Sequence, residues 1–351
     1  MISVHLESGR VEVQRRSVPR IAPGFARIRL IAAGICSTDL ELQRGYYGFR
    51  GTPGHEFVGE VVAVSSEGGD EVVRDSAPAG DMDRAQRHER PARLIACPTE
   101  WIGQRVAGEI NLACGICEWC RRGLGRHCPT RKVLGIVGHA GAFQEFLTLP
   151  IRNLRRVPRS IPDEHAVFIE PIAAACEILD QVAMTKGTRA AVLGDGKLGL
   201  LIAQVLHASG AEVHLLGRHR HKLKIADRAG IATEIMRKKL PRSAYPVVVD
   251  ATGSADGLGA AIAMCEPRGT VVMKSTVHGL VGIDAAPVIV NEITLVGSRC
   301  GRFEPAIKLL ASGKVRVGDL IAEEFSLDRA PEAFALAGTK GILKVLLRPP
   351  G

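Results

Sequence analysis

The chain has 351 residues and a mass of 37.5 kDa, enough for two domains that each bury a hydrophobic core. Hydrophobic residues make up 46% and charged residues 24%, which excludes a disordered chain, a collagen and a small disulfide scaffold. The formal charge is +9, but only 4% of residues are aromatic, which argues against single-stranded nucleic-acid binding on stacked rings.

The basic charge is concentrated in two regions. Residues 121–160 contain nine Lys or Arg and one acid, and residues 218–242 contain nine and two acids. Such regions bind nucleic acid, serve a phosphorylated small ligand or form a solvated surface. The first twenty residues are polar without an apolar core, so we expect no secretory signal, and no apolar run reaches the roughly 18 residues of a membrane span. Nine cysteines then predict metal-binding or catalytic thiols in a cytoplasmic protein without a membrane partner.

From residue 1 to about residue 149, short alternating apolar runs are broken by Gly and Pro. This pattern predicts a β-rich domain, with strands at 26–32, 57–64 and 142–149. Within it, residues 70–93 carry six acids and five basic residues, which predicts a mobile surface excursion. Its near-zero net charge argues against a nucleic-acid-binding arm.

The pattern changes after Pro171, where apolar strands alternate with helices. We predict strands at 189–193, 212–216, 247–251 and 269–273, with helices at 198–209 and 221–229. This alternation is typical of a parallel sheet with crossover helices. From residue 303 we predict one amphipathic helix, 304–311, and a final strand, 342–347. The expected fold class is therefore α/β: a β-rich domain over 1–171 and 302–351, and a doubly wound domain over 172–301.

Four cysteines lie close together in the first domain. Cys114, Cys117, Cys120 and Cys128 fall within fifteen residues, a spacing that predicts a closed tetrahedral zinc site. An iron–sulfur cluster uses similar spacings and remains an alternative. A closed zinc site has no position for substrate, so its role would be structural.

This cysteine spacing resembles the structural-zinc lobe of zinc-dependent medium-chain alcohol dehydrogenases. Upstream, residues 34–39 (GICSTD) and 54–59 (GHEFVG) are similar to that family's catalytic-zinc segments, in the same order. Residues 168–171 (FIEP) resemble the third-ligand segment of the polyol, sugar and threonine dehydrogenase branch, which uses Glu there. The resemblance runs from about Arg27 to Lys344. It implies a GroES-like catalytic domain, a Rossmann nucleotide-binding domain and a homodimer or homotetramer.

The resemblance implies that Cys36, His55 and Glu170 bind a catalytic zinc ion. One sulfur, one nitrogen and one oxygen leave the fourth zinc position open for water or substrate, where the metal lowers the pKa of a bound alcohol. Glu56 is either a fourth ligand or a partner of the zinc-bound water. Asp39 is a candidate for holding the His55 ring in place.

Thr38 matches the family position whose hydroxyl passes the substrate proton outward. A hydroxyl both donates and accepts hydrogen bonds, as a relay requires. Three residues later, where many members carry His, this chain has Glu41. That carboxylate either accepts the proton from Thr38 or is simply solvated.

A glycine-rich segment between a predicted strand and a predicted helix reads as a dinucleotide fingerprint. Asp195 puts a carboxylate near the phosphates, which is unfavourable unless it points to solvent, and Lys197 could offset it. The fingerprint and the residues expected to bind the cofactor with it are Gly194, Gly196, Lys197, Leu198 and Gly199.

The end of the second strand of this domain is expected to select the cofactor. NAD-specific members carry an acid there that binds the adenosine ribose. This chain has Gly217, followed by Arg218 and Arg220, which makes room and supplies positive charge for a 2′-phosphate. We therefore expect NADP to be preferred over NAD. Thr252 and Arg299 resemble strand-end residues on the nicotinamide side, although Arg299 could instead form an interdomain contact.

Together these features predict an enzyme that carries two zinc ions per chain, one catalytic and one structural. It would transfer a hydride between a small alcohol, such as a secondary alcohol, polyol or sugar, and NAD(P), or reduce the corresponding carbonyl. One alternative is a zinc-free NADPH-dependent quinone or enone reductase of the same superfamily. Another is a zinc- and NADP-binding sensor that acts on nucleic acid. The presence of Cys36, His55 and Glu170 argues against both.

Overall fold

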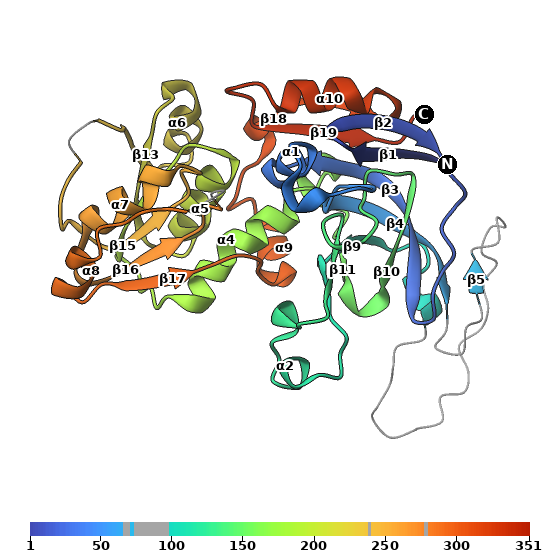
Figure 1. Ribbon diagram of the computed structural model, residues 1–351, viewed down its shortest axis with the longest axis horizontal. Helices are drawn as coiled ribbons and strands as arrows, with labels where there is room; N and C mark the ends of the chain where they lie inside the picture. The colour runs from blue at the N-terminus through green and yellow to red at the C-terminus, as the bar shows by residue number, and fades with distance from the viewer. Residues whose placement is uncertain (66–70, 74–97, 238–239, 277–279) are drawn as a thin grey trace.

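The computed structural model describes residues 1–65, 71–73, 98–237, 240–276 and 280–351. Two sheets organise the described chain, and they lie on opposite sides of the molecule in Figure 1. Apart from 71–73, the predicted surface excursion at 70–93 is outside the described residues, as is Cys97. None of the described helices has the length and apolarity that crossing a bilayer requires.

The β-rich domain is built around an eight-stranded sheet in which β4 and β19 flank β3. Alternate residues of β3 point into a hydrophobic core, so Ala26, Ile28 and Leu30 are buried. Because β19 comes from the end of the chain, the C-terminal segment completes this domain. The strands are β3 (Phe25–Ile35), β4 (Glu56–Ser65), β5 (Glu71–Val73), β6 (Arg105–Gly108), β10 (Phe146–Pro150), β11 (Leu154–Arg156), β18 (Ile321–Ser326) and β19 (Lys344–Arg348).

Smaller elements surround this sheet. A hairpin and a three-stranded sheet comprise β1 (Ile2–Glu7), β2 (Arg10–Arg15), β7 (Asn111–Leu112), β8 (Lys132–Leu134) and β9 (Gly138–His139). The helices of this part are α1 (Ser37–Gln43), α2 (Glu118–Arg121), α3 (Asp163–Ala166), α9 (Phe303–Ala311) and α10 (Ala330–Ala337). Helix α2 belongs to a lobe that projects from the domain in Figure 1.

The second domain has a six-stranded sheet in the order β14-β13-β12-β15-β16-β17, with every neighbouring pair parallel. The four residues of β12 after Arg189 are fully buried, as expected where helices cover both faces of a parallel sheet. The strands are β12 (Arg189–Leu193), β13 (Glu212–Gly217), β14 (Ala232–Ile235), β15 (Tyr245–Asp250), β16 (Cys265–Met273) and β17 (Thr294–Gly297). The helices are α5 (Lys197–Ala208), α6 (Arg220–Asp227), α7 (Ala255–Met264) and α8 (Ala286–Val290).

Helix α4 (Ile169–Gln181) lies between the two domains beside α9 (Figure 1). Pro171 is tolerated because it falls in the first helical turn, where its missing N–H would have no intrahelical acceptor. The helix therefore runs through the predicted domain boundary at 171/172 instead of beginning after it. Glu170 is the second residue of this helix, so the helix that lies at the domain junction also positions a candidate zinc ligand.

The expected fold class is confirmed, with differences in detail. The predicted amphipathic helix at 304–311 is confirmed as α9, but the C-terminal part also contains α10, which the sequence interpretation did not include. The sequence of α10, APEAFALA, is dominated by alanine and gives little apolar contrast. The predicted strand at 142–149 begins only at Phe146, because Ala142 and Phe143 are buried in a bend that pairs with Gly54 and Pro53.

Candidate active site

Asp39 connects the two segments that carry the first candidate zinc ligands. Cys36 caps the N-terminus of α1, and its backbone N–H donates to Asp39 Oδ2 at 2.8 Å. The backbone N–H of Gly54, next to His55, donates to Asp39 Oδ1 at 3.1 Å. The Asp39 side chain is fully buried, so these two bonds fix Cys36 and His55 relative to each other.

The His55 ring presents one nitrogen to the thiol of Cys36. The distance from His55 Nε2 to Cys36 Sγ is 3.2 Å, and His55, Cys36 and Asp39 form one group with metal-ligating atoms within 4.8 Å of one another. The other nitrogen, His55 Nδ1, is buried without a hydrogen-bond partner, 3.7 Å from Asp39 Oδ1. Burial opposes a charge on the ring, but Cys36 and Asp39 outweigh it and raise the pKa of His55 well above its usual range.

His55 also belongs to a second group, with Glu56 and Glu170, whose ligand atoms lie within 4.8 Å of one another. Burial raises the pKa of Glu170. Glu56, the first residue of β4, pairs with the buried ammonium of Lys344 on β19. Cys36 and Glu170 fall in different groups that share His55, so the predicted set of Cys36, His55 and Glu170 is not one such group among the described residues. Sulfur, imidazole and carboxylate donors are the ligand types that zinc accepts, so the two groups together have the chemistry of a catalytic zinc site.

The two proton-relay candidates have different surroundings. Thr38 lies in the first turn of α1, directly after the Cys36 segment, and is half-buried. Glu41 forms an ion pair with Arg44 at 2.6 Å, and its side chain is 34% exposed. These contacts favour the solvated interpretation of Glu41.

The four cysteines of the projecting lobe face one another. The Sγ atom of Cys117 lies 3.4 Å from that of Cys120 and 3.8 Å from that of Cys128, and the Sγ atoms of Cys114 and Cys120 are 3.9 Å apart. A tetrahedron with zinc–sulfur bonds of about 2.3 Å has sulfur–sulfur edges of about 3.8 Å. The cluster therefore has the size of a closed zinc site.

Arg126 links this lobe to the junction between the domains. Its guanidinium donates to Glu177 on α4 at 2.5 Å and to the backbone carbonyl of Cys300. Glu177 is largely buried, so the pair is worth more than an exposed ion pair.

The fingerprint glycines have the roles that a dinucleotide-binding turn requires. Gly194 has φ of +113°, and a Cβ at Gly199 would lie 2.0 Å from the carbonyl oxygen of Gly194. A Cβ at Gly196 would meet nothing within 4 Å, and Gly196 caps α5 without a side-chain cap. The open space and the free N–H groups at the start of α5 fit the pyrophosphate of a nicotinamide dinucleotide. Leu198 lies in the first turn of the same helix.

The carboxylate of Asp195 does not point to solvent. Its side chain is buried and hydrogen-bonded to the segment after β13, where it fills the space beside Gly217. Gly217 therefore leaves no open room, contrary to the sequence interpretation. Arg218 and Arg220 are exposed.

Two further cofactor candidates make local contacts. Thr252 Oγ1 donates to Asp250 Oδ1 at 2.7 Å, which orders the turn after β15. Arg299 Nη2 donates to Asn111 Oδ1 of the β-rich domain at 2.9 Å. The interdomain interpretation of Arg299 therefore has a direct contact in its favour.

Three lysines gather where the domains meet, and sequence reasoning missed two of them. Lys344 pairs with Glu56, and Lys274 Nζ donates to the carbonyl of Arg299 at 2.7 Å. Lys197 Nζ reaches the carbonyl of Ile35 in the β-rich domain at 3.4 Å. Burial lowers the pKa of Lys274 to about 8. A lysine inside the apolar run 342–347 was the available signal for Lys344.

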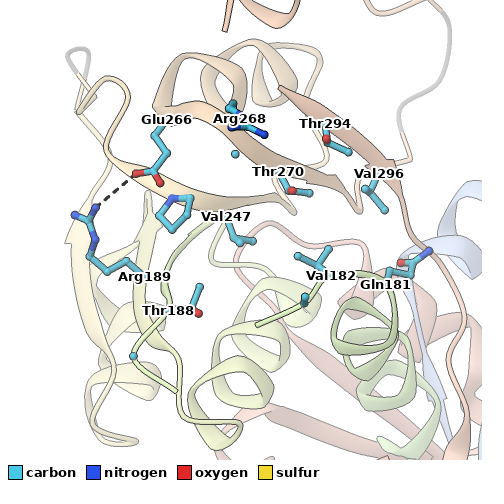
Figure 2. A pocket seen from close by; sticks show the side chains of 14 residues that line it. Gln181, Val182, Thr188, Arg189, Val247, Glu266, Arg268, Thr270, Thr294 and Val296 are labelled. Atoms are coloured by element: carbon cyan, nitrogen blue, oxygen red, sulfur yellow. Dashed lines mark ion pairs between the residues drawn. The ribbon is translucent and has the colours of Figure 1, made fainter. Parts of the chain in front are cut away.

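A pocket of about 570 Å³ lies in the second domain, away from the candidate zinc ligands (Figure 2). It is lined at the starts of β12, β15 and β17, with an ion pair of 3.6 Å between Arg189 and Glu266 at its rim. Cofactors bind at the carboxyl ends of parallel strands, so this pocket is at the opposite edge from the fingerprint. It takes no part in the site.

Comparison with known proteins finds two family matches and several similar dehydrogenases. Residues 22–159 match the alcohol dehydrogenase GroES-like domain, and residues 198–312 match the zinc-binding dehydrogenase model. D-altritol 5-dehydrogenase of Agrobacterium fabrum is 30% identical over 306 residues, covering 84% of this chain and 82% of that protein. L-threonine 3-dehydrogenase of Chelativorans sp. is 29% identical over 346 residues, covering 92% and 91%.

A crystal structure of a Sinorhizobium meliloti 1021 protein bound to NADP superimposes with a TM-score of 0.83 at 27% identity, covering 99% of both chains. The fold and the site together define a zinc-binding, nicotinamide-dependent dehydrogenase. The chain belongs to the zinc-containing medium-chain alcohol dehydrogenase family, in the branch of polyol, sugar and threonine dehydrogenases.

Proposed function

We propose that this enzyme transfers a hydride between a secondary alcohol of a polyol or sugar and NAD(P), and reduces the corresponding ketone in reverse. The observation that carries the proposal is the group of ligating atoms from His55, Glu56 and Glu170 beside Cys36. The similarity to D-altritol 5-dehydrogenase supports a polyol, and the similarity to L-threonine 3-dehydrogenase supports a secondary alcohol.

The proposed metal site is held by Cys36, His55 and Glu170. Zinc bound there would act as a Lewis acid and lower the pKa of an alcohol hydroxyl. Asp39 fixes the backbone at Cys36 and Gly54, and its carboxylate lies 3.7 Å from His55 Nδ1, where its charge would favour one orientation of the ring. Glu56, paired with Lys344, contributes a neutralised carboxylate beside His55 rather than a free one.

We assign the outward transfer of the substrate proton to Thr38. Its hydroxyl can accept that proton and donate its own, and its place in the first turn of α1 puts it beside the Cys36 segment. The fingerprint turn and the start of α5 would hold the cofactor pyrophosphate. Thr252, Arg218 and Arg220 line the same edge of the sheet as candidate cofactor contacts.

The remaining assignments are also proposals. Residues 1–171 and 302–351 would form the catalytic domain and 172–301 the nucleotide-binding domain, with α4 shared between them. A homodimer or homotetramer and a cytoplasmic location follow from the family resemblance and the cysteine usage. The choice between NADP and NAD depends on the residues at the end of β13.

The test is a substrate screen with purified, zinc-loaded enzyme. D-altritol, other polyols and secondary alcohols are offered with NAD and with NADP, and formation of the reduced nicotinamide is followed. We expect turnover with at least one polyol and none in the Cys36→Ser variant. Reduction of enones by NADPH that is equal in wild type and Cys36→Ser, without alcohol turnover, would instead establish the zinc-free reductase.

A further inference from the structure

The carboxylate of Asp195 lies at the end of β13, although Asp195 belongs to the turn after β12. Arg218 N donates to Asp195 Oδ2 at 2.7 Å, and His219 N donates to the same oxygen at 2.5 Å. The Nδ1 atom of His219 lies 3.1 Å from both carboxylate oxygens. Asp195 is only 7% exposed, so these contacts fix its side chain against the neighbouring strand.

Asp195 occupies the space of the side chain that Gly217 lacks. A Cβ built on Gly217 would lie 2.5 Å from Asp195 Cβ and 2.6 Å from Asp195 Oδ2. No ordinary side chain fits there, so Gly217 is required by Asp195 rather than by a bulky cofactor group. The carboxylate therefore stands beside the strand position where a dinucleotide-binding domain usually carries its ribose-binding acid.

The charge of this carboxylate is maintained at neutral pH. Burial opposes ionisation, but the N–H groups of His219 and Arg218 and the His219 ring hold the pKa of Asp195 below its usual range. An ionised carboxylate accepts hydrogen bonds from ribose hydroxyls, and it repels a 2′-phosphate in the same place. Asp195 Oδ1 takes no backbone N–H in the structure, so that oxygen retains capacity for a ribose hydroxyl.

The two arginines that suggested NADP are less favourably placed. Arg218 and Arg220 are exposed, so solvent and salt weaken their attraction for a phosphate. The buried negative charge is therefore expected to outweigh the two exposed positive charges.

We propose that Asp195 replaces the missing strand-end acid, binds the adenosine ribose and makes this dehydrogenase prefer NAD over NADP. The inference rests on the proposed function, because it concerns the cofactor of that reaction. It reverses the preference expected from Gly217, Arg218 and Arg220 alone. It also means that Gly217→Asp is a poor test of selectivity, since the new side chain would collide with Asp195.

The experiment measures dissociation constants for NAD and NADP by calorimetric titration of the zinc-loaded enzyme without substrate. Wild type is compared with Asp195→Asn, which keeps the shape and removes the charge, and with Asp195→Ala. The matched control is Asp227→Asn, which removes an exposed carboxylate from α6 of the same domain. Thermal unfolding of each variant verifies that it is folded.

We expect wild type to bind NAD about tenfold or more tightly than NADP, and Asp195→Asn to reduce that ratio by about tenfold. Asp227→Asn should leave the ratio unchanged. Equal weakening of both cofactors in Asp195→Asn would show that Asp195 only braces the turn, and would overturn the inference. Tighter binding of NADP by wild type would overturn it as well.

The Asp195→Asn and wild-type ratios decide the question even if Asp195→Ala does not fold. Failure of this inference is distinguishable from failure of the proposed function. An enzyme that binds both cofactors without discrimination keeps its proposed function and loses the role of Asp195. An enzyme that binds neither cofactor loses both.

Discussion

Asp39 connects the two backbone segments that carry Cys36 and His55. Its two oxygens bind the backbone of Cys36 and of Gly54, so one buried carboxylate sets the spacing of two ligand segments. The Nδ1 atom of His55, which has no hydrogen-bond partner, lies 3.7 Å from Asp39 Oδ1. Such supporting contacts typically change metal affinity by about 10–100-fold when removed.

Asp39→Asn should therefore release the catalytic zinc while the cysteine cluster keeps its own. The amide can accept one of the two backbone N–H bonds but cannot supply the charge that faces His55. Elemental analysis after dialysis against a weak chelator should give about one zinc per chain instead of about two. Retention of both ions with unchanged turnover would show that Asp39 has no part in holding the site.

Substitutions of Thr38 and Glu41, which both lie on α1, should have different effects on kcat. Thr38→Val keeps the side-chain shape and removes the hydroxyl, so kcat should fall by about 100-fold or more with little change in KM. Glu41→Gln removes only a charge that is paired with Arg44 at the surface, and kcat should stay within about twofold. Steady-state kinetics with a polyol measures both. A large loss of kcat in Glu41→Gln would instead place that carboxylate in the proton path.

Lys197 should make cofactor binding depend on pH. Burial and the nearby Lys344 lower the pKa of Lys197 to about 8, so its positive charge is present below that pH and lost above it. A pyrophosphate at the start of α5 would favour the charged form, so the dissociation constant should rise as pH increases through 8. Lys197→Met should bind more weakly at pH 7 and lose this slope. An identical slope in the variant would assign the titration to another group.

At the scale of elements, the motif residues were easier to predict than their partners. The cysteine cluster could be predicted from sequence spacing, because its geometry depends on one short loop that holds Cys114, Cys117, Cys120 and Cys128. The contact between Arg126 and Glu177 could not be predicted from the sequence, because it joins the cysteine lobe to a helix far along the chain. The direction of the Asp195 side chain also depends on packing between two strands, so the sequence did not decide whether this carboxylate faces the phosphates or solvent.

The ion pair between Arg126 and Glu177 is expected to fasten the cysteine lobe to α4. Arg126→Gln should lower the melting midpoint by roughly 2–4 °C, because Glu177 is left largely buried without its partner. It should also speed proteolysis of the lobe. The control is Arg122→Gln, whose ion pair with Glu118 is exposed at both ends and should contribute little. Equal effects of the two variants would mean that the lobe is not fastened through Arg126.

At the scale of the molecule, the sequence predicts two domains and their kinds, while the junction between them needed the structure. Alternating strands and helices specify the parallel sheet, and β12 matches its predicted bounds. Helix α4 crosses the predicted boundary, because a proline in the first turn does not end a helix. The three lysines at the junction come from distant segments, so no local pattern could have grouped them.

We expect one chain to hold a structural zinc ion and a separate catalytic zinc ion. Elemental analysis of chelator-free wild type, Cys36→Ser and Cys114→Ser tests this expectation most directly. We predict about two zinc ions in wild type and about one in each variant, with the remaining ion in Cys36→Ser held by the cysteine cluster. One zinc in wild type that survives Cys36→Ser and is lost in Cys114→Ser would contradict the catalytic site.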